Sequence, residues 1–93
     1  MENLKWKIYK RIGAKIVYYR TLRGLTQGQL ADLVHLSEST ISKIERNSYN
    51  KSISLDTLLD ITNGLGIEFT ALFSSDHGEK MFWKEMRKQN KIP

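Results

Sequence analysis

The segment from Gly24 to Asn47 constrains the fold of this chain more than any other feature. It holds two short stretches of helical periodicity, separated by a tight turn around His35. Thr26 and Gln29 have the spacing of a capping box at the start of the first stretch, and Ser37 is a natural N-cap for the second. The segment therefore predicts two short helices joined by a turn, within residues 26–46.

The second of these helices, expected over residues 38–46, has little apolar surface. Ile41 and Ile44 are three residues apart and face inward. The outward positions carry short hydroxyls near the start and cations near the end: Glu38, Ser39, Ser42, Lys43 and Arg46. A solvated helix usually carries paired Glu and Lys instead. Short polar groups suit base edges in the major groove of DNA, and Lys or Arg suits guanine or phosphate.

The distribution of charge supports a polyanionic partner. The chain has 93 residues and a net charge of +5, and residues 1–51 contain ten Lys or Arg against four acids. The basic half coincides with the two-helix segment, as expected of a face that binds phosphates. A solvated basic surface without a partner is the alternative that charge alone leaves open.

The rest of the sequence predicts further helices and no strands. Residues 4–23 carry an apolar stripe at Leu4, Ile8, Ile12, Ile16 and Tyr19, ended by Gly24. Ser54 caps a helix through about residue 63, and a short helix is expected over 68–73. A last helix is expected over 79–89, after a break at 74–78. We predict one all-α domain over residues 1–93, with its core in 8–73.

In order and spacing, this pattern resembles the Cro/CI (phage-repressor-like) helix-turn-helix family. The resemblance covers about residues 11–73. It rests on Ile-Gly-x-Lys-Ile-x-x-Tyr-Arg-x-x-x-Gly-Leu-Thr-Gln-x-x-Leu-Ala, then Leu-Ser-x-x-x-Ile-Ser-x-Ile-Glu-Arg, then Ser-Leu-x-x-Leu-x-x-Ile-x-x-x-Leu-Gly-Ile. Around Ile44–Asn50 the chain is also similar to the controller proteins of restriction–modification systems. The resemblance implies a five-helix, lambda-repressor-like domain, to which the C-terminal helix is an addition.

Two departures from the family pattern fall in turns. His35 stands where the family commonly has Gly between the two helices, and Asn47 stands where Gly usually follows the second. His and Asn are among the few residue types besides Gly that adopt positive φ. Neither departure is expected to disturb the fold.

The second helix and its neighbours supply the expected DNA contacts. Base reading is expected from its first turns, and phosphate contacts from its flanks and the following loop. The Glu38 carboxylate can accept a hydrogen bond from cytosine N4, or it can act as a favourable charge at a helix N-terminus. Gln27, Thr40 and Ser42 can contact phosphates, or they can simply be solvent-exposed residues of a helix. The expected base-reading residues are Ser37, Glu38, Ser39 and Lys43. The expected phosphate-contacting residues are Gln27, Thr40, Ser42, Arg46, Asn47, Ser48, Asn50 and Lys51.

The resemblance also implies a structural ion pair and a homodimer. The family pairs the residues that correspond to Arg20 and Glu45, which stand in otherwise apolar faces. Exposed apolar clusters mark interfaces, and Met81-Phe82-Trp83 is such a cluster on the added helix. It has two readings, packing against the first helix or contacting a second subunit. The residues expected at the dimer interface are Phe69, Leu72, Phe73 and Trp83.

Several other functions are excluded or disfavoured. The chain has no Cys, and His35 and His77 are poorly accompanied for a metal site, so neither a metal nor a cofactor is expected. It has no glycine-rich phosphate loop and no catalytic triad, and enzyme activity is not expected. No apolar run reaches the roughly 18 residues needed to span a bilayer. A cytoplasmic location without a membrane partner follows.

Together these features predict a sequence-specific transcriptional regulator that binds double-stranded DNA. The resemblance implies a near-palindromic operator, a homodimer, and insertion of the second helix of the motif into the major groove. A restriction–modification controller, a phage-type repressor and an antitoxin remain open within this reading, as do activation and repression. The alternative is a protein-interaction module that uses the same fold to bind a second protein.

Overall fold

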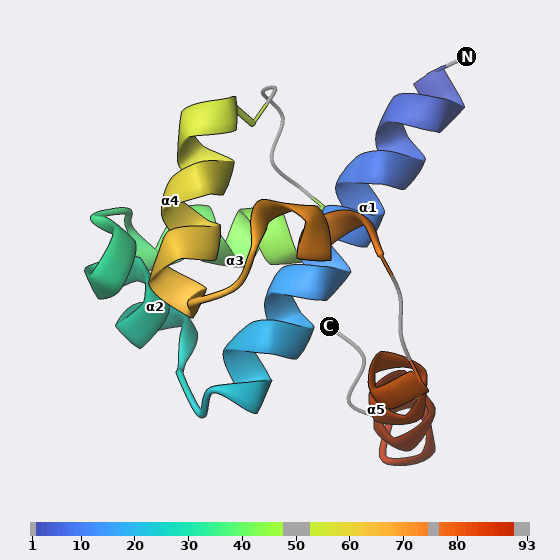
Figure 1. The fold of residues 1–93 in the computed structure, drawn as a ribbon. Coiled ribbons are helices and arrows are strands. Elements are labelled where there is room, and N and C mark those ends of the chain that lie inside the picture. Colours follow the sequence, from blue (N-terminus) through green and yellow to red (C-terminus); the bar gives the residue numbers. More distant parts are fainter. Residues whose placement is uncertain (1, 48–52, 75–76, 91–93) are drawn as a thin grey trace.

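The computed structural model describes residues 2–47, 53–74 and 77–90, and the prediction of an all-α fold is confirmed for them (Figure 1). They form five α-helices and one 3₁₀-helix. The elements are α1 (Glu2–Leu22), α2 (Gln27–Val34), α3 (Glu38–Glu45), α4 (Leu55–Leu65), η1 (Phe69–Phe73) and α5 (His77–Lys88).

Most helix starts lie where the sequence places them. Thr26 and Gln29 form the expected capping box, with the Gln29 amide donating to Thr26 Oγ1 at 3.0 Å and the Thr26 amide donating to Gln29 Oε1 at 2.8 Å. Ser37 caps α3 and Ser54 caps α4, each accepting from the amide three residues on at 3.0 Å. These side chains satisfy amides that have no partner inside their own helix.

Three elements differ from expectation. Helix α5 spans His77–Lys88, so it begins inside the break expected over 74–78. The short fifth helix is a 3₁₀-helix over Phe69–Phe73, a form common in such short connecting pieces. Helix α4 continues through Gly64 to Leu65 and ends only at Gly66, where φ is 70°. Position 64, inside α4, is a glycine because α2 passes close to it. A Cβ at this position would lie 2.6 Å from Val34 Cγ1.

The core lies where α1, α2, α3, α4 and η1 meet. Its buried members are Ile12, Ile16, Leu30, Ala31, Val34, Ile41, Ile44, Leu58, Ile61, Leu65 and Leu72. The buried part of the α1 stripe begins at Ile12, whereas Leu4 and Ile8 are exposed by 67% and 40%. They are exposed because the N-terminal turns of α1 project beyond the other helices (Figure 1).

One expected interface residue is in this core. Leu72 is fully buried, so its assignment to a dimer interface is wrong. A 3₁₀-helix turns every three residues, so Phe69 and Leu72 share the side that faces the core, and Phe69 is partly buried against it. Phe73 comes one position later, on another side of the turn, and remains 49% exposed.

Helix α5 lies against α1, and Figure 1 shows it nearly end-on beside that helix. Lys15 of α1 and Glu79 of α5 form an ion pair in which both side chains are buried. The Phe82 ring packs edge-on against Tyr18, with ring centroids 5.2 Å apart. The C-terminal cluster thus packs in part on the middle of α1, while Met81 is 50% exposed, so contact with a second subunit stays a prediction.

Candidate nucleic-acid interface

The turn between α2 and α3 sets the angle at which α3 leaves the core. His35 has φ 59° and ψ 39°, the left-handed geometry expected at this position. The Leu36 amide donates to the Ala31 carbonyl at 3.0 Å, which closes the end of α2. Leu36 is partly buried against the core, so the turn is held by packing as well as by hydrogen bonds.

The inner face of α3 is tied to the core at both apolar positions. Ile41 and Ile44 are 0% and 2% exposed. Gly13 allows α1 to cross the end of α3 closely, because a Cβ there would lie 2.6 Å from the Ile44 carbonyl oxygen and 2.9 Å from that of Glu45. Any side chain at residue 13 would push α3 away from α1.

A network of charged and polar groups holds the C-terminal end of α3. Arg20 Nε and Nη2 donate to the two carboxylate oxygens of Glu45 at 2.6 and 3.0 Å, the expected ion pair in bidentate form. Gln27 Nε2 donates to Glu45 Oε1 at 2.9 Å, and Arg20 Nη1 donates to the Leu25 carbonyl at 2.8 Å. Gln27 therefore links the start of α2 to the end of α3. The Glu45 side chain is only 1% exposed.

The outer face of α3 is polar and faces away from the protein. Glu38, Ser39, Lys43 and Arg46 are exposed, and Thr40 and Ser42 are half-buried. Ser37 Oγ and Thr40 Oγ1 share a hydrogen bond of 2.8 Å, and Arg46 Nε donates to the Ser42 carbonyl at 3.3 Å. Short hydroxyls and cations on an uncovered helix are able to meet base edges and phosphates.

Glu38 lies over the first turn of α2. Its Oε1 is 3.3 Å from the position of a Cβ on Gly28, the second residue of α2. A carboxylate there faces the partial positive charge of a helix N-terminus. This placement favours the helix-charge reading of Glu38 in the protein without DNA.

Of the remaining expected phosphate contacts, only Asn47 is among the described residues. Asn47 has φ 56°, the left-handed geometry expected of it, and is half-buried. Ser48, Asn50 and Lys51 lie outside the described residues. Trp83, expected at the dimer interface, lies on α5 beside Trp6, Lys10 and the end of α3.

Sequence reasoning missed the buried Lys15–Glu79 pair. A signal was present, because Lys15 follows Ile12 by three residues on the buried face of α1. Glu79 likewise precedes Phe82 and Trp83 by three and four residues, which puts all three on one face of α5. The Trp83 indole N–H donates to Glu79 Oε2 at 3.3 Å.

In the part of the chain that the structure describes, no group of three or more His, Asp or Glu residues is placed to hold a metal ion. No helix within the described ranges combines the length and the apolar character needed to cross a bilayer.

The sequence and the fold are similar to those of known helix-turn-helix proteins. The helix-turn-helix family HTH_3 matches residues 16–72. An immunity repressor protein of Bacillus phage phi105 is 40% identical over 74 residues, which are 80% of this chain and 47% of the phage protein. This chain therefore spans about half the length of that relative. An uncharacterized HTH-type transcriptional regulator of Methanocaldococcus jannaschii is 36% identical over 67% of this chain and 94% of its own length.

Solved structures with this fold include restriction–modification controller proteins. That of C.AhdI from Aeromonas hydrophila is 32% identical with a TM-score of 0.65, over 70% of this chain and 96% of the controller. A point mutant of the controller C.Esp1396I is 30% identical with a TM-score of 0.64, over 87% and 95% of the two chains. With the matched family model covering α2, α3, α4 and the last turns of α1, this chain belongs to the HTH_3 (XRE/Cro/CI) family of DNA-binding helix-turn-helix proteins.

Proposed function

We propose that the protein binds a near-palindromic operator as a homodimer and regulates transcription by occupying it. The observation that carries this proposal is the contrast between the two faces of α3. Its inner face is anchored by Ile41, Ile44 and the Arg20–Glu45–Gln27 network, while its outer face is polar and uncovered. A helix held rigidly from behind is suited to enter the major groove.

Within this proposal, the residues of α3 divide into two roles. Ser39 and Lys43 are the strongest base-reading candidates because they are exposed and lie one turn apart. The Ser37 hydroxyl also caps the helix and the Glu38 carboxylate lies over the first turn of α2, and both remain base-reading candidates. Phosphate contacts are assigned to Gln27, Thr40, Ser42, Arg46, Asn47, Ser48, Asn50 and Lys51.

The proposed dimer surface lies on α4 and η1. Leu55, Leu59 and Phe73 are exposed by 59%, 43% and 49%, and the Phe69 and Phe73 rings are 5.5 Å apart. Leu59 and Phe69 border the same shallow hollow, which Asp60, Thr62 and Asn63 also line, so apolar side chains of the two elements lie close together on a surface of mixed polarity. Exposed apolar side chains grouped in this way mark an interaction surface. Trp83 is left out of this surface because it lies on α5, close to α1 and the end of α3.

The relatives supply two biological roles that fit this mechanism. One relative is a phage immunity repressor, and two solved neighbours are restriction–modification controllers. In either role the protein acts in the cytoplasm by binding its operator and blocking or recruiting polymerase.

Selection of binding sites from random duplex DNA, followed by footprinting, tests the proposal. Two-fold symmetry predicts two half-sites on one face of the duplex, with centres about one helical turn or 34 Å apart. The affinity should fall with salt, with a log–log slope on the order of −6 to −10 for a dimer. Failure to bind any duplex at low salt would refute the proposal and favour the protein-interaction module.

A further inference from the structure

A hollow of about 390 Å³ lies between α1, the end of α3 and α5. One face of α1 contributes Trp6, Lys10 and Ala14 at four-residue spacing. The end of α3 contributes residues 45–47, and α5 contributes Trp83. Small-molecule sites in proteins occupy about 300–1,000 Å³, so the hollow has the size of a ligand site.

Two indole rings form the apolar part of this hollow. Trp6 is 51% exposed, with the Lys10 ammonium over one face of its ring, and Trp83 is half-buried. The hydrogen bond from the Trp83 indole to Glu79 orients its ring, and Glu79 is in turn anchored by buried Lys15. Trp6, Lys10, Ala14 and Trp83 lie outside residues 16–72, so the aromatic side of the hollow belongs to parts of this chain that the family match does not include, whereas residues 45–47 lie within it.

The charges around the hollow favour an anion. The Lys10 ammonium lies 4.9 Å from the centroid of the Trp6 ring, and Arg46 is exposed at the other side. Glu45 is the one acid among the described lining residues. Its charge is compensated within the protein, because both its oxygens accept from Arg20 and one also accepts from Gln27. Two cations beside two aromatic rings suit a ligand that is flat and carries one negative charge.

We propose that this hollow is an effector site for a small planar aromatic carboxylate, whose binding weakens the binding of DNA. The carboxylate would pair with Lys10 and Arg46, and the aromatic part would pack against the two indoles. Arg46 and Asn47 are also assigned to DNA phosphates, so one group of side chains serves two ligands. This coupling rests on the function proposed above, whereas the site itself does not.

The direction of the effect follows from linkage. A ligand that draws Arg46 toward the hollow binds better to the free protein than to the DNA complex. DNA must then weaken the binding of the ligand by the same factor. The ligand carboxylate and a DNA phosphate would compete for the same guanidinium, that of Arg46 at the end of α3.

The first test uses naphthalene-2-carboxylate as the probe and naphthalene-2-carboxamide as its uncharged counterpart, with no DNA present. The chain has two Trp, so a ¹H–¹⁵N spectrum contains two indole N–H signals. The carboxylate should shift both signals along one saturable curve, and the carboxamide should bind about tenfold more weakly, since the charge-assisted hydrogen bonds are lost. No saturable shift of either indole, or equal binding of the two probes, would overturn the proposal.

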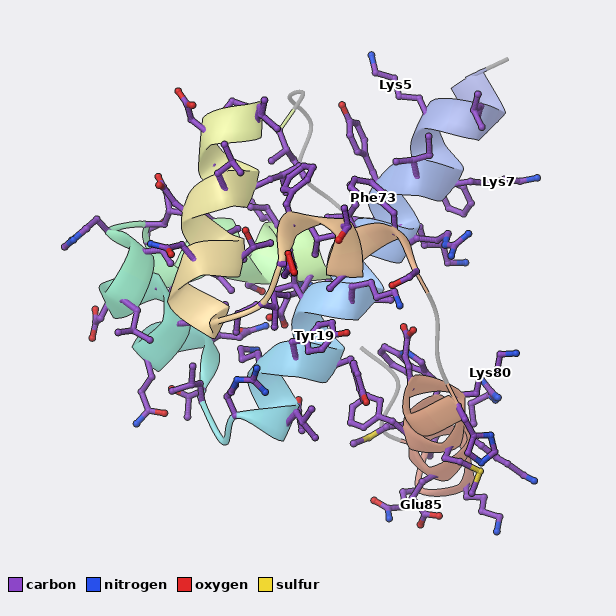
Figure 2. All side chains as sticks on the ribbon, viewed as in Figure 1. Lys5, Lys7, Tyr19, Phe73, Lys80 and Glu85 are labelled. Atoms are coloured by element: carbon purple, nitrogen blue, oxygen red, sulfur yellow. The ribbon has the colours of Figure 1, made fainter. Side chains whose placement is uncertain are left out.

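A matched pair of variants locates the anion site. Lys10→Gln should weaken carboxylate binding about fivefold or more, because it removes one of the two cations. Lys7→Gln makes the same charge change on the same helix, but Lys7 is not part of the hollow and points away from the body of the protein (Figure 2). It should bind the probe like the unchanged protein. Equal losses in both variants would mean that general charge, and not this site, attracts the probe.

The second test measures operator affinity with and without saturating carboxylate. Affinity should fall with the carboxylate, and at the same concentration the carboxamide should lower it less, because it binds about tenfold more weakly and carries no charge to attract Arg46. The Lys10→Gln variant should need about fivefold more carboxylate for the same effect. A probe that binds the hollow but leaves operator affinity unchanged would refute the coupling. If no DNA is bound at all, the function proposed above fails while the probe titration still decides the site.

Discussion

At the scale of single residues, Lys43 and Arg46 are expected to contribute differently to DNA binding. Lys43 lies on the exposed face of α3, whereas Arg46 caps its C-terminal end and donates to the Ser42 carbonyl. Lys43→Ala should cost about 1–3 kcal/mol on the preferred operator and relax the preference at one base pair per half-site.

Arg46→Ala should instead weaken binding to all sequences alike and flatten the salt slope by about one unit per contact removed. Both variants should be measured on a panel of single-base operator mutants over a range of salt concentrations. A changed base preference in Arg46→Ala, with none in Lys43→Ala, would reverse the two roles.

The Arg20–Glu45 pair gives a second prediction at this scale, for stability. Arg20→Ala should cost roughly 3 kcal/mol, because it leaves the 1%-exposed Glu45 carboxylate with only Gln27. Glu45→Ala should cost less, since the Arg20 side chain is 15% exposed and keeps the Leu25 carbonyl. The double variant should lose less than the sum of the single losses in urea unfolding. Small, additive losses would contradict the bidentate pair.

At the scale of elements, α5 is expected to open independently of the rest of the domain. Glu79 is its one buried residue among those described, and it pairs with buried Lys15. Glu79→Ala leaves that ammonium buried without a partner, unless α5 detaches and lets water reach it. Amides of α5 should then exchange at least about tenfold faster, while those of the core helices keep their protection.

Glu85→Ala is the matched control for this measurement. Glu85 lies on the same helix and points into solvent (Figure 2), where it accepts an exposed hydrogen bond from Gln89. Its removal should leave the exchange of α5 nearly unchanged. Equal acceleration in the two variants would show that helix propensity, rather than the buried pair, controls the opening of α5.

At the scale of the whole molecule, the surface on α4 and η1 is expected to hold two copies together. Phe73→Glu should weaken the dimer by about 2–3 kcal/mol, or roughly 100-fold, because a charge would be buried in an apolar contact. Leu22→Glu is the control, since Leu22 is 59% exposed at the C-terminal end of α1, and that end lies apart from η1 (Figure 1). Sedimentation equilibrium would decide, and equal dissociation of both variants would contradict the assigned surface.

The sequence by itself determined the helices and the motif, because the signals for these are local. Caps at Thr26, Ser37 and Ser54 are set by one side chain and an amide three residues away. Left-handed turns at His35 and Asn47 follow from residue types that tolerate positive φ. The inward face of α3 follows from the three-residue spacing of Ile41 and Ile44.

Only the tertiary structure decided which apolar and charged residues are covered, because coverage depends on elements distant in sequence. Leu72 is buried against the core while neighbouring Phe73 is exposed, and Leu4 of an apolar stripe remains in solvent because α1 extends past its partners. Lys15 and Glu79 are 64 positions apart, and no local pattern pairs them. The hollow beside α3 likewise exists only because α5 returns to α1 and brings Trp83 close to Trp6 and Arg46. The spacing of apolar residues in a helix determines which of its faces is apolar. The packing of the other elements determines whether that face is buried and which residues it contacts.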